Sequence, residues 1–144
     1  MAVEQTFIII KPEAVERRLV GEILGRFERK GLEIKGLRVT KISEDLAKEH
    51  YAHHENKPFF SQLIEAITRG PVVLAVLEGN DSVSQVRTLV GATDPVKAAP
   101  GTIRGDLAVR LPYNMVHAAD SPANALIEIE RFFGSCLSGM PKGS

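Results

Sequence analysis

The sequence predicts a domain of the α/β (α+β) class, in which helices pack on an antiparallel four-stranded sheet. Two observations predict it. Short apolar runs of strand length recur along the chain, and between them lie segments whose apolar residues repeat every three to four residues, as on one face of a helix. Glycine, proline and serine stand at many of the boundaries, where turns and helix ends favour them.

The first part of the chain predicts a strand, a helix and a second strand. Residues 6–11 form a short apolar run, typical of a buried strand. The helix that follows has apolar residues at i, i+3, i+4 and i+7, namely Val20, Ile23, Leu24 and Phe27. Gly31 is placed to end this helix. A second strand is expected over residues 34–42, where Leu37 and Val39 alternate with polar residues.

Two further helices are expected next. Ser43 and Asp45 are candidate caps for a helix that runs to about Tyr51. Pro58 is expected to open the second helix, and the Gly-Pro pair at 70–71 to end it. Its apolar stripe consists of Phe60, Leu63, Ile64 and Ile67.

The rest of the chain predicts two strands and two helices around one irregular segment. Residues 72–77 form a third, nearly all-apolar strand, and residues 115–117 a short fourth one. The helix between them carries an apolar stripe at Val83, Val86, Leu89 and Val90. Residues 91–113 contain several prolines and glycines and no clear period, and such a long irregular segment is usually functional. Ser121 and Pro122 are expected to open the last helix. Its inner face is Leu126, Ile129 and Phe133.

This order of elements matches two interleaved βαβ halves, the ferredoxin-like βαββαβ plan. The whole chain, residues 1–144, is long enough for one domain with a real core, and residues 134–144 are expected to form a short tail. Because this plan hosts many activities, the function must be argued from particular residues.

Composition excludes several functional classes. Apolar residues make up 44% and charged residues 25%, which is typical of soluble globular proteins. The formal net charge is zero, so neither a nucleic acid nor a membrane is expected as a partner. Cys136 is the only cysteine, which rules out an internal disulfide and favours a reducing compartment, so a cytoplasmic location is expected.

Several residues are candidates for binding phosphate, although the chain has neither a P-loop nor a dinucleotide fingerprint. Lys11 ends a buried strand, and Pro12 makes the chain turn there, which would present the ammonium at a sheet edge or cleft. Arg87 on a helix and Arg104 in the irregular segment carry guanidinium groups that match phosphate oxygens. Thr93 adds a hydroxyl. For each of them, a side chain in solvent is the ordinary alternative.

His117 is the candidate nucleophile. Glu128 follows 11 residues later, on a helix expected to run back along the strand of His117. A carboxylate on one ring nitrogen fixes the tautomer and leaves the other lone pair free to attack. The alternatives are a structural histidine and a surface glutamate paired with Arg131.

Two other features have open interpretations. Phe59 points away from the stripe that Phe60 joins, so it either stacks on a base or packs ordinarily. A cluster of histidines and glutamates lies at the end of the second predicted helix, but its spacing fits no standard zinc pattern; its members are Glu49, His50, His53, His54 and Glu55.

Together these residues resemble the nucleoside diphosphate kinases. The family signature N-x-x-H-G-S-D-S is matched by Asn114-Met115-Val116-His117-Ala118-Ala119-Asp120-Ser121. Further matches, at residues 11–12, 50–51, 57–60, 70–73, 91–95 and 100–106, spread the resemblance from Thr6 to about Phe133. The number and order of these matches argue against chance.

The resemblance implies an enzyme that transfers the γ-phosphoryl group of ATP or another nucleoside triphosphate to a nucleoside diphosphate. The route it implies is ping-pong, through a phosphohistidine at His117 that Glu128 orients, with Lys11 and Tyr51 also in the catalytic site. The nucleotide-binding residues that it implies are Lys11, Phe59, Arg87, Thr93, Arg104, Leu111 and Asn114, with His54 as a further phosphate contact. Phe59 and Leu111 would enclose the base, and stacking would give little preference among bases.

The resemblance also implies Mg²⁺ as a cofactor, held mainly by the nucleotide phosphates rather than by a protein metal site. It further implies a homo-oligomer, either a hexamer or a tetramer, built from dimers whose sheet edges meet.

Three residues depart from the family pattern. Ala14 replaces a glycine and would alter the turn if that position needs a positive φ. Ala118 and Ala119 replace Gly-Ser, and the missing serine hydroxyl helps to hold the glutamate in the family. One lost hydrogen bond costs on the order of 1 kcal/mol, so an active but slower enzyme is expected. The alternatives are a degenerate member that binds nucleotide without turnover and a non-catalytic ferredoxin-like sensor module; DNA binding has little support.

Overall fold

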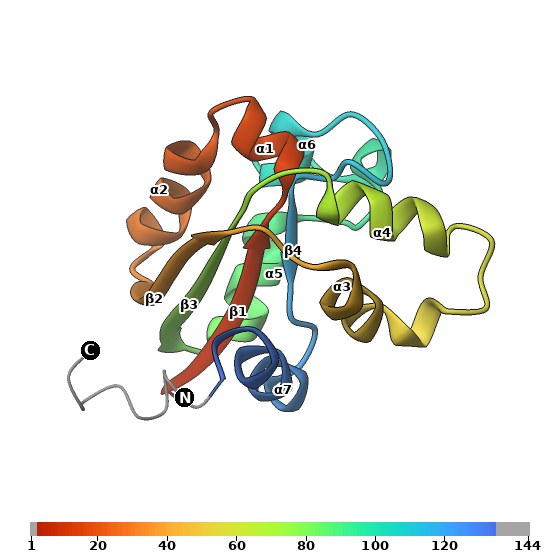
Figure 1. The fold of residues 1–144 in the computed structure, drawn as a ribbon. Coiled ribbons are helices and arrows are strands. Elements are labelled where there is room, and N and C mark those ends of the chain that lie inside the picture. The colour runs from red at the N-terminus through yellow and green to blue at the C-terminus, as the bar shows by residue number, and fades with distance from the viewer. Residues whose placement is uncertain (1–2, 135–144) are drawn as a thin grey trace.

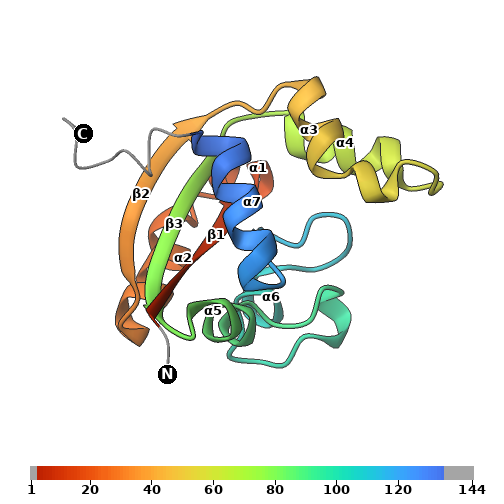
Figure 2. The same cartoon turned by 90° about the horizontal axis from the view of Figure 1, so that it is seen from below.

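The computed structural model describes residues 3–134, which form an antiparallel sheet with helices on both faces (Figures 1 and 2). The strands are β1 (Val3–Ile10), β2 (Glu33–Thr40), β3 (Val72–Asn80) and β4 (Val116–Ala118). Their order in the sheet is β2-β3-β1-β4, and every neighbouring pair is antiparallel. The predicted ferredoxin-like plan is confirmed. Cys136 and the predicted tail beyond Gly134 lie outside the described residues.

Helices and short 3-10 turns connect these strands. The helices are α1 (Pro12–Glu16), α2 (Val20–Lys30), α3 (Glu44–His50), α4 (Phe60–Thr68), α5 (Ser82–Val90), α6 (Ile103–Leu107) and α7 (Pro122–Phe133), and the 3-10 turns are η1 (Ala52–His54) and η2 (Pro95–Lys97). None of the helices in the described part combines the length and apolar character needed to cross a bilayer.

The two faces of the sheet bury separate sets of side chains, because successive strand residues point to opposite sides. Ile8 and Ile10 of β1 pack with α2 and α5 on one face. Phe7 and Ile9 pack with α3, α4 and α7 on the other. Figure 2 shows α7 across one face of the sheet and α2 behind the other.

Local sequence signals set several helix ends as predicted. Ser43 caps α3 by accepting a hydrogen bond from the backbone N–H of Leu46. Ser121 caps α7 in the same way through Asn124. Gly31 ends α2 in the left-handed conformation, with φ of 106°.

One expectation was wrong, and one short helix was not predicted. The segment 91–113 is not irregular throughout, because it contains η2 and α6. No pattern in the sequence predicted α1. Each of these elements spans five residues or fewer, too short to show a helical period. They depend on contacts instead: Thr102 caps α6 by accepting from the N–H of Gly105, where any side chain would overlap the carbonyl of Ala99.

Ala14 does not disturb the turn after β1. It is fully buried within α1, where the backbone is right-handed helical and an alanine fits without strain. The position therefore needs no positive φ, so the condition under which this substitution would alter the turn is not met.

The register of β4 decides where His117 points. His117 lies opposite Ile9 of β1, so it shares the face of Phe7 and Ile9. Because α3 and α7 pack on that face, residues from both helices can approach the imidazole.

Candidate active site

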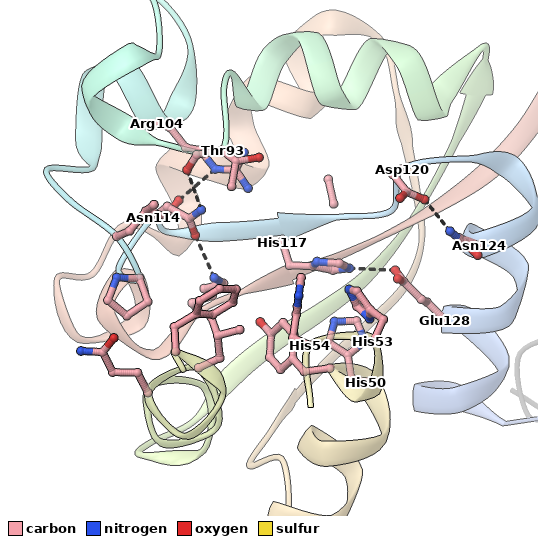
Figure 3. A pocket seen from close by; sticks show the side chains of 18 of the residues that line it. His50, His53, His54, Thr93, Arg104, Asn114, His117, Asp120, Asn124 and Glu128 are labelled. Carbon is pink, nitrogen blue, oxygen red and sulfur yellow. Dashed lines mark hydrogen bonds and ion pairs between the residues drawn. The ribbon is translucent and has the colours of Figure 1, made fainter. Parts of the chain in front are cut away.

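A cavity of about 790 Å³ lies beside the carboxyl end of β1, and all the predicted site residues line it (Figure 3). These are Lys11, Tyr51, His54, Phe59, Arg87, Thr93, Arg104, Leu111, Asn114, His117 and Glu128. They come from elements that are distant in the sequence, so their convergence is a property of the fold. Lining residues that were not among the predicted site residues include His50, Asp120 and Asn124.

His117 and Glu128 form a hydrogen-bonded pair. Nε2 of His117 lies 2.8 Å from Oε1 of Glu128. Burial, together with the charges of Lys11, Arg104 and Arg87, lowers the pKa of His117 to about 3. A neutral imidazole that donates from Nε2 keeps its free lone pair on Nδ1. The arrangement therefore presents Nδ1 as a nucleophile, and the alternative pairing of Glu128 with Arg131 is wrong.

Lys11 is buried rather than solvated. Its Nζ donates to Oδ1 of Asn114 at 2.8 Å, and Nδ2 of Asn114 donates to the carbonyl of Thr93 at 2.9 Å. Burial lowers the pKa of Lys11 to about 8, and the nearby carboxylate of Glu13 opposes that shift. The chain of hydrogen bonds fixes the ammonium beside the cavity, so it is available to an anion there.

The two arginines differ in how many of their guanidinium N–H donors already make hydrogen bonds within the protein. Arg104 is buried and donates to three carbonyls, those of Gly91, Asn114 and Val116. It thus ties the segment before α6 to the approach to β4, and only its remaining N–H groups can meet a ligand. Arg87 lines the cavity, is exposed and donates from Nη1 to the carbonyl of Ala118 at 3.3 Å, so its other donors are available to a ligand.

A strained turn precedes the histidine. Met115 has φ of 77°, and the N–H of Val116 donates to the carbonyl of Asn114 at 2.9 Å, the pattern of a γ-turn. A non-glycine residue in this conformation costs about 1–3 kcal/mol and persists only where its surroundings enforce it. Two hydrogen bonds do so: Glu13 accepts from the Met115 N–H, and the Lys11 N–H donates to the Met115 carbonyl. No sequence signal pointed to this turn.

Two exposed apolar side chains stand at the cavity. Phe59 is 41% exposed and Leu111 is 47% exposed, although both are large. The ring of His54 lies 5.3 Å from that of Phe59. Such surfaces suit a flat aromatic ligand, since stacking requires only a π-face and no particular pattern of donors.

The charged side chains around the cavity favour an anion over a bare metal ion. The compact group of possible metal ligands among residues 3–134 is His50, His117 and Glu128, whose ligand atoms lie within 4.8 Å of one another, and not the histidine cluster considered from the sequence. Nδ1 of His50 already contacts the guanidinium of Arg131. The cationic side chains of Lys11, Arg87 and Arg104 oppose a bare cation.

Comparisons with known proteins agree with this geometry. Residues 4–137 match the family model described as nucleoside diphosphate kinase. Among curated proteins, the chain is 55% identical over 131 residues to the nucleoside diphosphate kinase of Rubrobacter xylanophilus, covering 91% of this chain and 98% of that protein. It is 56% identical over 131 residues to the one of Mycobacterium leprae, covering 90% and 96%.

Solved structures give the same result. The apo nucleoside diphosphate kinase of Encephalitozoon cuniculi superimposes with a TM-score of 0.91 at 40% identity, covering 93% of this chain and 91% of that one. The halophilic enzyme of Halobacterium salinarum, solved in complex with CDP, gives 0.90 at 48% identity, covering 92% and 88%.

Proposed function

The chain belongs to the nucleoside diphosphate kinase family, and we propose that His117 is the residue that carries the phosphoryl group between two nucleotides. The enzyme transfers the γ-phosphoryl group of a nucleoside triphosphate to a nucleoside diphosphate. The observation that carries the proposal is the Nε2–Glu128 bond, which leaves the Nδ1 lone pair of a neutral imidazole free in a cavity lined with cations.

In the first half-reaction, Nδ1 attacks the γ-phosphorus while the bond from that phosphorus to the β–γ bridging oxygen breaks. The nucleoside diphosphate leaves with the electron pair of the broken bond. Glu128 stabilises the positive charge that grows on the ring, through the Nε2–H. The second half-reaction reverses these steps with a different diphosphate. Phosphoryl transfer asks mainly for positioning and charge stabilisation, which these side chains supply.

The cationic and the polar side chains would contact different parts of the nucleotide. Arg87 and the remaining donors of Arg104 would contact the phosphates, as would Thr93 and, at the rim, His54. Lys11 and Asn114 would meet the ribose hydroxyl and the phosphates, with Tyr51 near the reacting ring. Mg²⁺ would be held mainly by the nucleotide phosphates rather than by protein side chains, and it would neutralise part of their charge.

The base would stack on Phe59, with Leu111 on its other side. The CDP complex of the Halobacterium relative supports this assignment to a nucleotide. Since a stacking surface accepts any base, ATP and other nucleoside di- and triphosphates are the expected ligands.

We further propose a homo-oligomer, a tetramer or a hexamer, in the cytoplasm. β2 is an edge strand of the sheet, and its Leu37 and Val39 are 53% and 69% exposed. An edge that no strand pairs with in the described part of the chain, and that has exposed apolar residues, is a surface that a second copy could cover. Native mass spectrometry of the wild type and of Val39→Lys tests this, because loss of the assembly in the variant is expected.

Labelling with γ-phosphate-labelled ATP tests the central proposal. Label on the protein that is acid-labile and base-stable, that moves to GTP when unlabelled GDP is added, and that is absent from His117→Ala is the expected result. Label that reaches GTP in His117→Ala would contradict the role of His117. If the wild type binds nucleotide but takes up no label, a degenerate binding protein is favoured. If His117→Ala keeps its biological function unchanged, a sensor module is favoured.

A further inference from the structure

A second buried pair lies behind His117. His50 is the last residue of α3 and only 5% exposed, and its Nδ1 lies 3.0 Å from Nη1 of Arg131 on α7. A guanidinium can only donate, so Nδ1 of His50 must accept and its proton must lie on Nε2. Burial, with the charges of Arg131 and Lys11, lowers the pKa of His50 far below its ordinary value. The ring is therefore a neutral imidazole in one tautomer.

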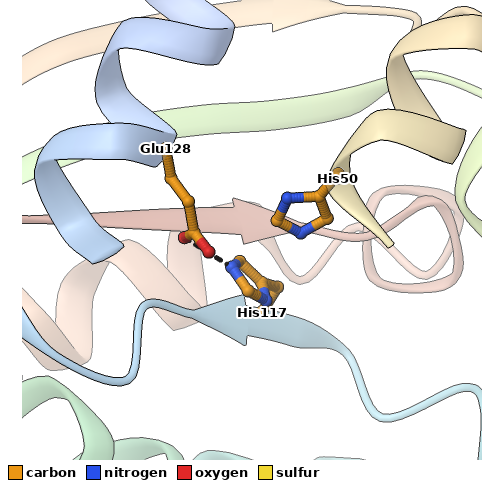
Figure 4. Close-up of side chains that lie close together, drawn as sticks. All are labelled: His50, His117 and Glu128. Carbon is orange, nitrogen blue, oxygen red and sulfur yellow. Dashed lines mark hydrogen bonds and ion pairs between the residues drawn. The ribbon is translucent and has the colours of Figure 1, made fainter. Parts of the chain in front are cut away.

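His50 also touches His117 directly. The two rings meet edge to face, with centroids 4.5 Å apart and planes at 85°. Phe132 and Tyr51 pack on the His50 ring at 5.2 Å and 4.8 Å, so it has little freedom to turn. Figure 4 shows His50 and Glu128 approaching His117 from different helices. The imidazole of His117 is thus constrained on two sides.

We propose that Arg131 and His50 form a positioning pair for His117, which keeps its ring in the orientation where Nε2–H meets Glu128 and Nδ1 faces the phosphates. Arg131 fixes the tautomer and the orientation of His50, and His50 fixes the orientation of the His117 ring, whose tautomer the bond to Glu128 selects. This inference rests on the proposed role of His117.

Two observations separate this role from ordinary packing. Packing against Phe132 and Tyr51 needs a ring but no hydrogen bond, whereas the bond from Arg131 selects one tautomer. In addition, residue 119 is an alanine and offers no hydroxyl to Glu128. Arg131 also favours the charged form of Glu128, against the effect of burial, so the same guanidinium acts on both partners of His117.

The test compares single-turnover phosphorylation of His117 by ATP in the wild type, His50→Phe, Arg131→Met and the double variant. His50→Phe keeps a ring but loses the acceptor. Each single change is expected to slow phosphorylation by about fivefold to tenfold, the effect of one hydrogen bond, with ATP affinity unchanged. Because the two residues act as one unit, the double variant should be no slower than either single one. Arg131→Lys, which keeps a donor, should recover part of the rate.

Glu49→Gln is the matched control. It removes the 3.5 Å ion pair between Glu49 and Arg131 but leaves the bond from Arg131 to His50, so the wild-type rate is expected. Nitrogen-15 NMR of His117 adds a direct readout. The wild type should show the Nε2–H tautomer, and His50→Phe a mixture.

Two results would overturn the proposed positioning role of Arg131 and His50. One is a wild-type phosphorylation rate in folded His50→Phe and Arg131→Met. The other is a double variant in which the two losses of rate multiply. Arg131 is partly exposed, so its variant decides the matter even if His50→Phe does not fold. If the wild type takes up no label at His117, the proposed function itself fails. Label in the wild type with unchanged rates in the variants overturns only this inference.

Discussion

The carboxylate of Glu13 accepts the backbone N–H of Met115 at 3.0 Å, although 102 residues separate the two in the sequence. This bond joins α1 to the strained turn that leads into β4, two residues before His117. The other oxygen of Glu13, Oε1, is buried and has no hydrogen-bond partner among residues 3–134, and the charge of the carboxylate acts on Lys11. Glu13 therefore has two separable effects, one on the turn and one on the ammonium.

Glu13→Ala and Glu13→Gln should separate these effects. In Glu13→Ala the buried N–H of Met115 loses its partner, so a loss of about 1–3 kcal/mol in the free energy of unfolding is expected. The turn should also relax and slow phosphorylation of His117. Glu13→Gln keeps an acceptor and should retain most of the stability, as measured by urea unfolding. Equal stability losses in both variants would show that the charge, rather than the hydrogen bond, holds the turn.

Lys11 is expected to set an alkaline limit to activity. Burial lowers its pKa to about 8, so the free enzyme loses the ammonium as the pH rises through that value. The kcat/KM for ATP, which reports ionisation of the free enzyme, should therefore fall above about pH 8. Glu13 raises the pKa of Lys11, so Glu13→Gln should move this limb to lower pH. A limb that stays in place in Glu13→Gln would mean that another group titrates.

On its acid side, the pH profile of the phosphorylation rate should show no titration of a histidine with an ordinary pKa. A histidine nucleophile must be neutral, and the lowered pKa of His117 keeps it so far below the usual 6.5. The phosphorylation rate is thus expected to stay level as the pH falls from neutral through 6.5, and to fall only where Glu128, whose pKa burial raises, takes up a proton. Glu128→Gln should be slower and should lack this acid limb. A midpoint near 6.5 in stopped-flow measurements would contradict the buried, neutral imidazole.

The sequence predicted the His117–Glu128 pair because both residues lie on adjoining elements, and a helix that returns along its strand brings the two side chains together. It could not predict the turn at Met115 or the Arg131–His50 bond. Those contacts join residues 102 and 81 positions apart, and nothing in the local pattern of Lys11-Pro12-Glu13 shows which backbone group its carboxylate will meet. The short helices α1 and α6 were not predicted for a related reason: tertiary contacts stabilise them, and their sequences are too short to show an apolar period.

Phe59 offers a test of base stacking that leaves the chemistry alone. Phe59→Ala removes an exposed ring, so stability should change by less than about 0.5 kcal/mol. Stacking is worth about 1–3 kcal/mol per base, so the Kd for ADP and GDP should rise by at least about fivefold, with similar factors for both. Isothermal titration calorimetry measures this directly. Val109→Ala, another exposed apolar residue, is the control and should bind as the wild type does.

Ala119→Ser tests whether an added hydroxyl can hydrogen-bond to Glu128 and fix its position more firmly. Ala119 is fully buried in a small cluster with Val83 and Ala125, beside the helix that carries Glu128. A hydroxyl that reaches Glu128 should raise the phosphorylation rate by up to about tenfold, whereas one that does not would leave a buried polar group and cost about 1–3 kcal/mol of stability.

The same change in the Arg131→Met background shows which support Glu128 uses. If Arg131 and His50 already compensate for the missing hydroxyl, Ala119→Ser should accelerate phosphorylation more in Arg131→Met than in the wild type, because the new bond then replaces a lost one. Ala118→Ser, whose side chain joins the core on the opposite face of β4, should produce no gain in either background. Equal gains from Ala119→Ser in both backgrounds would mean that the hydroxyl and the Arg131–His50 pair act on Glu128 independently.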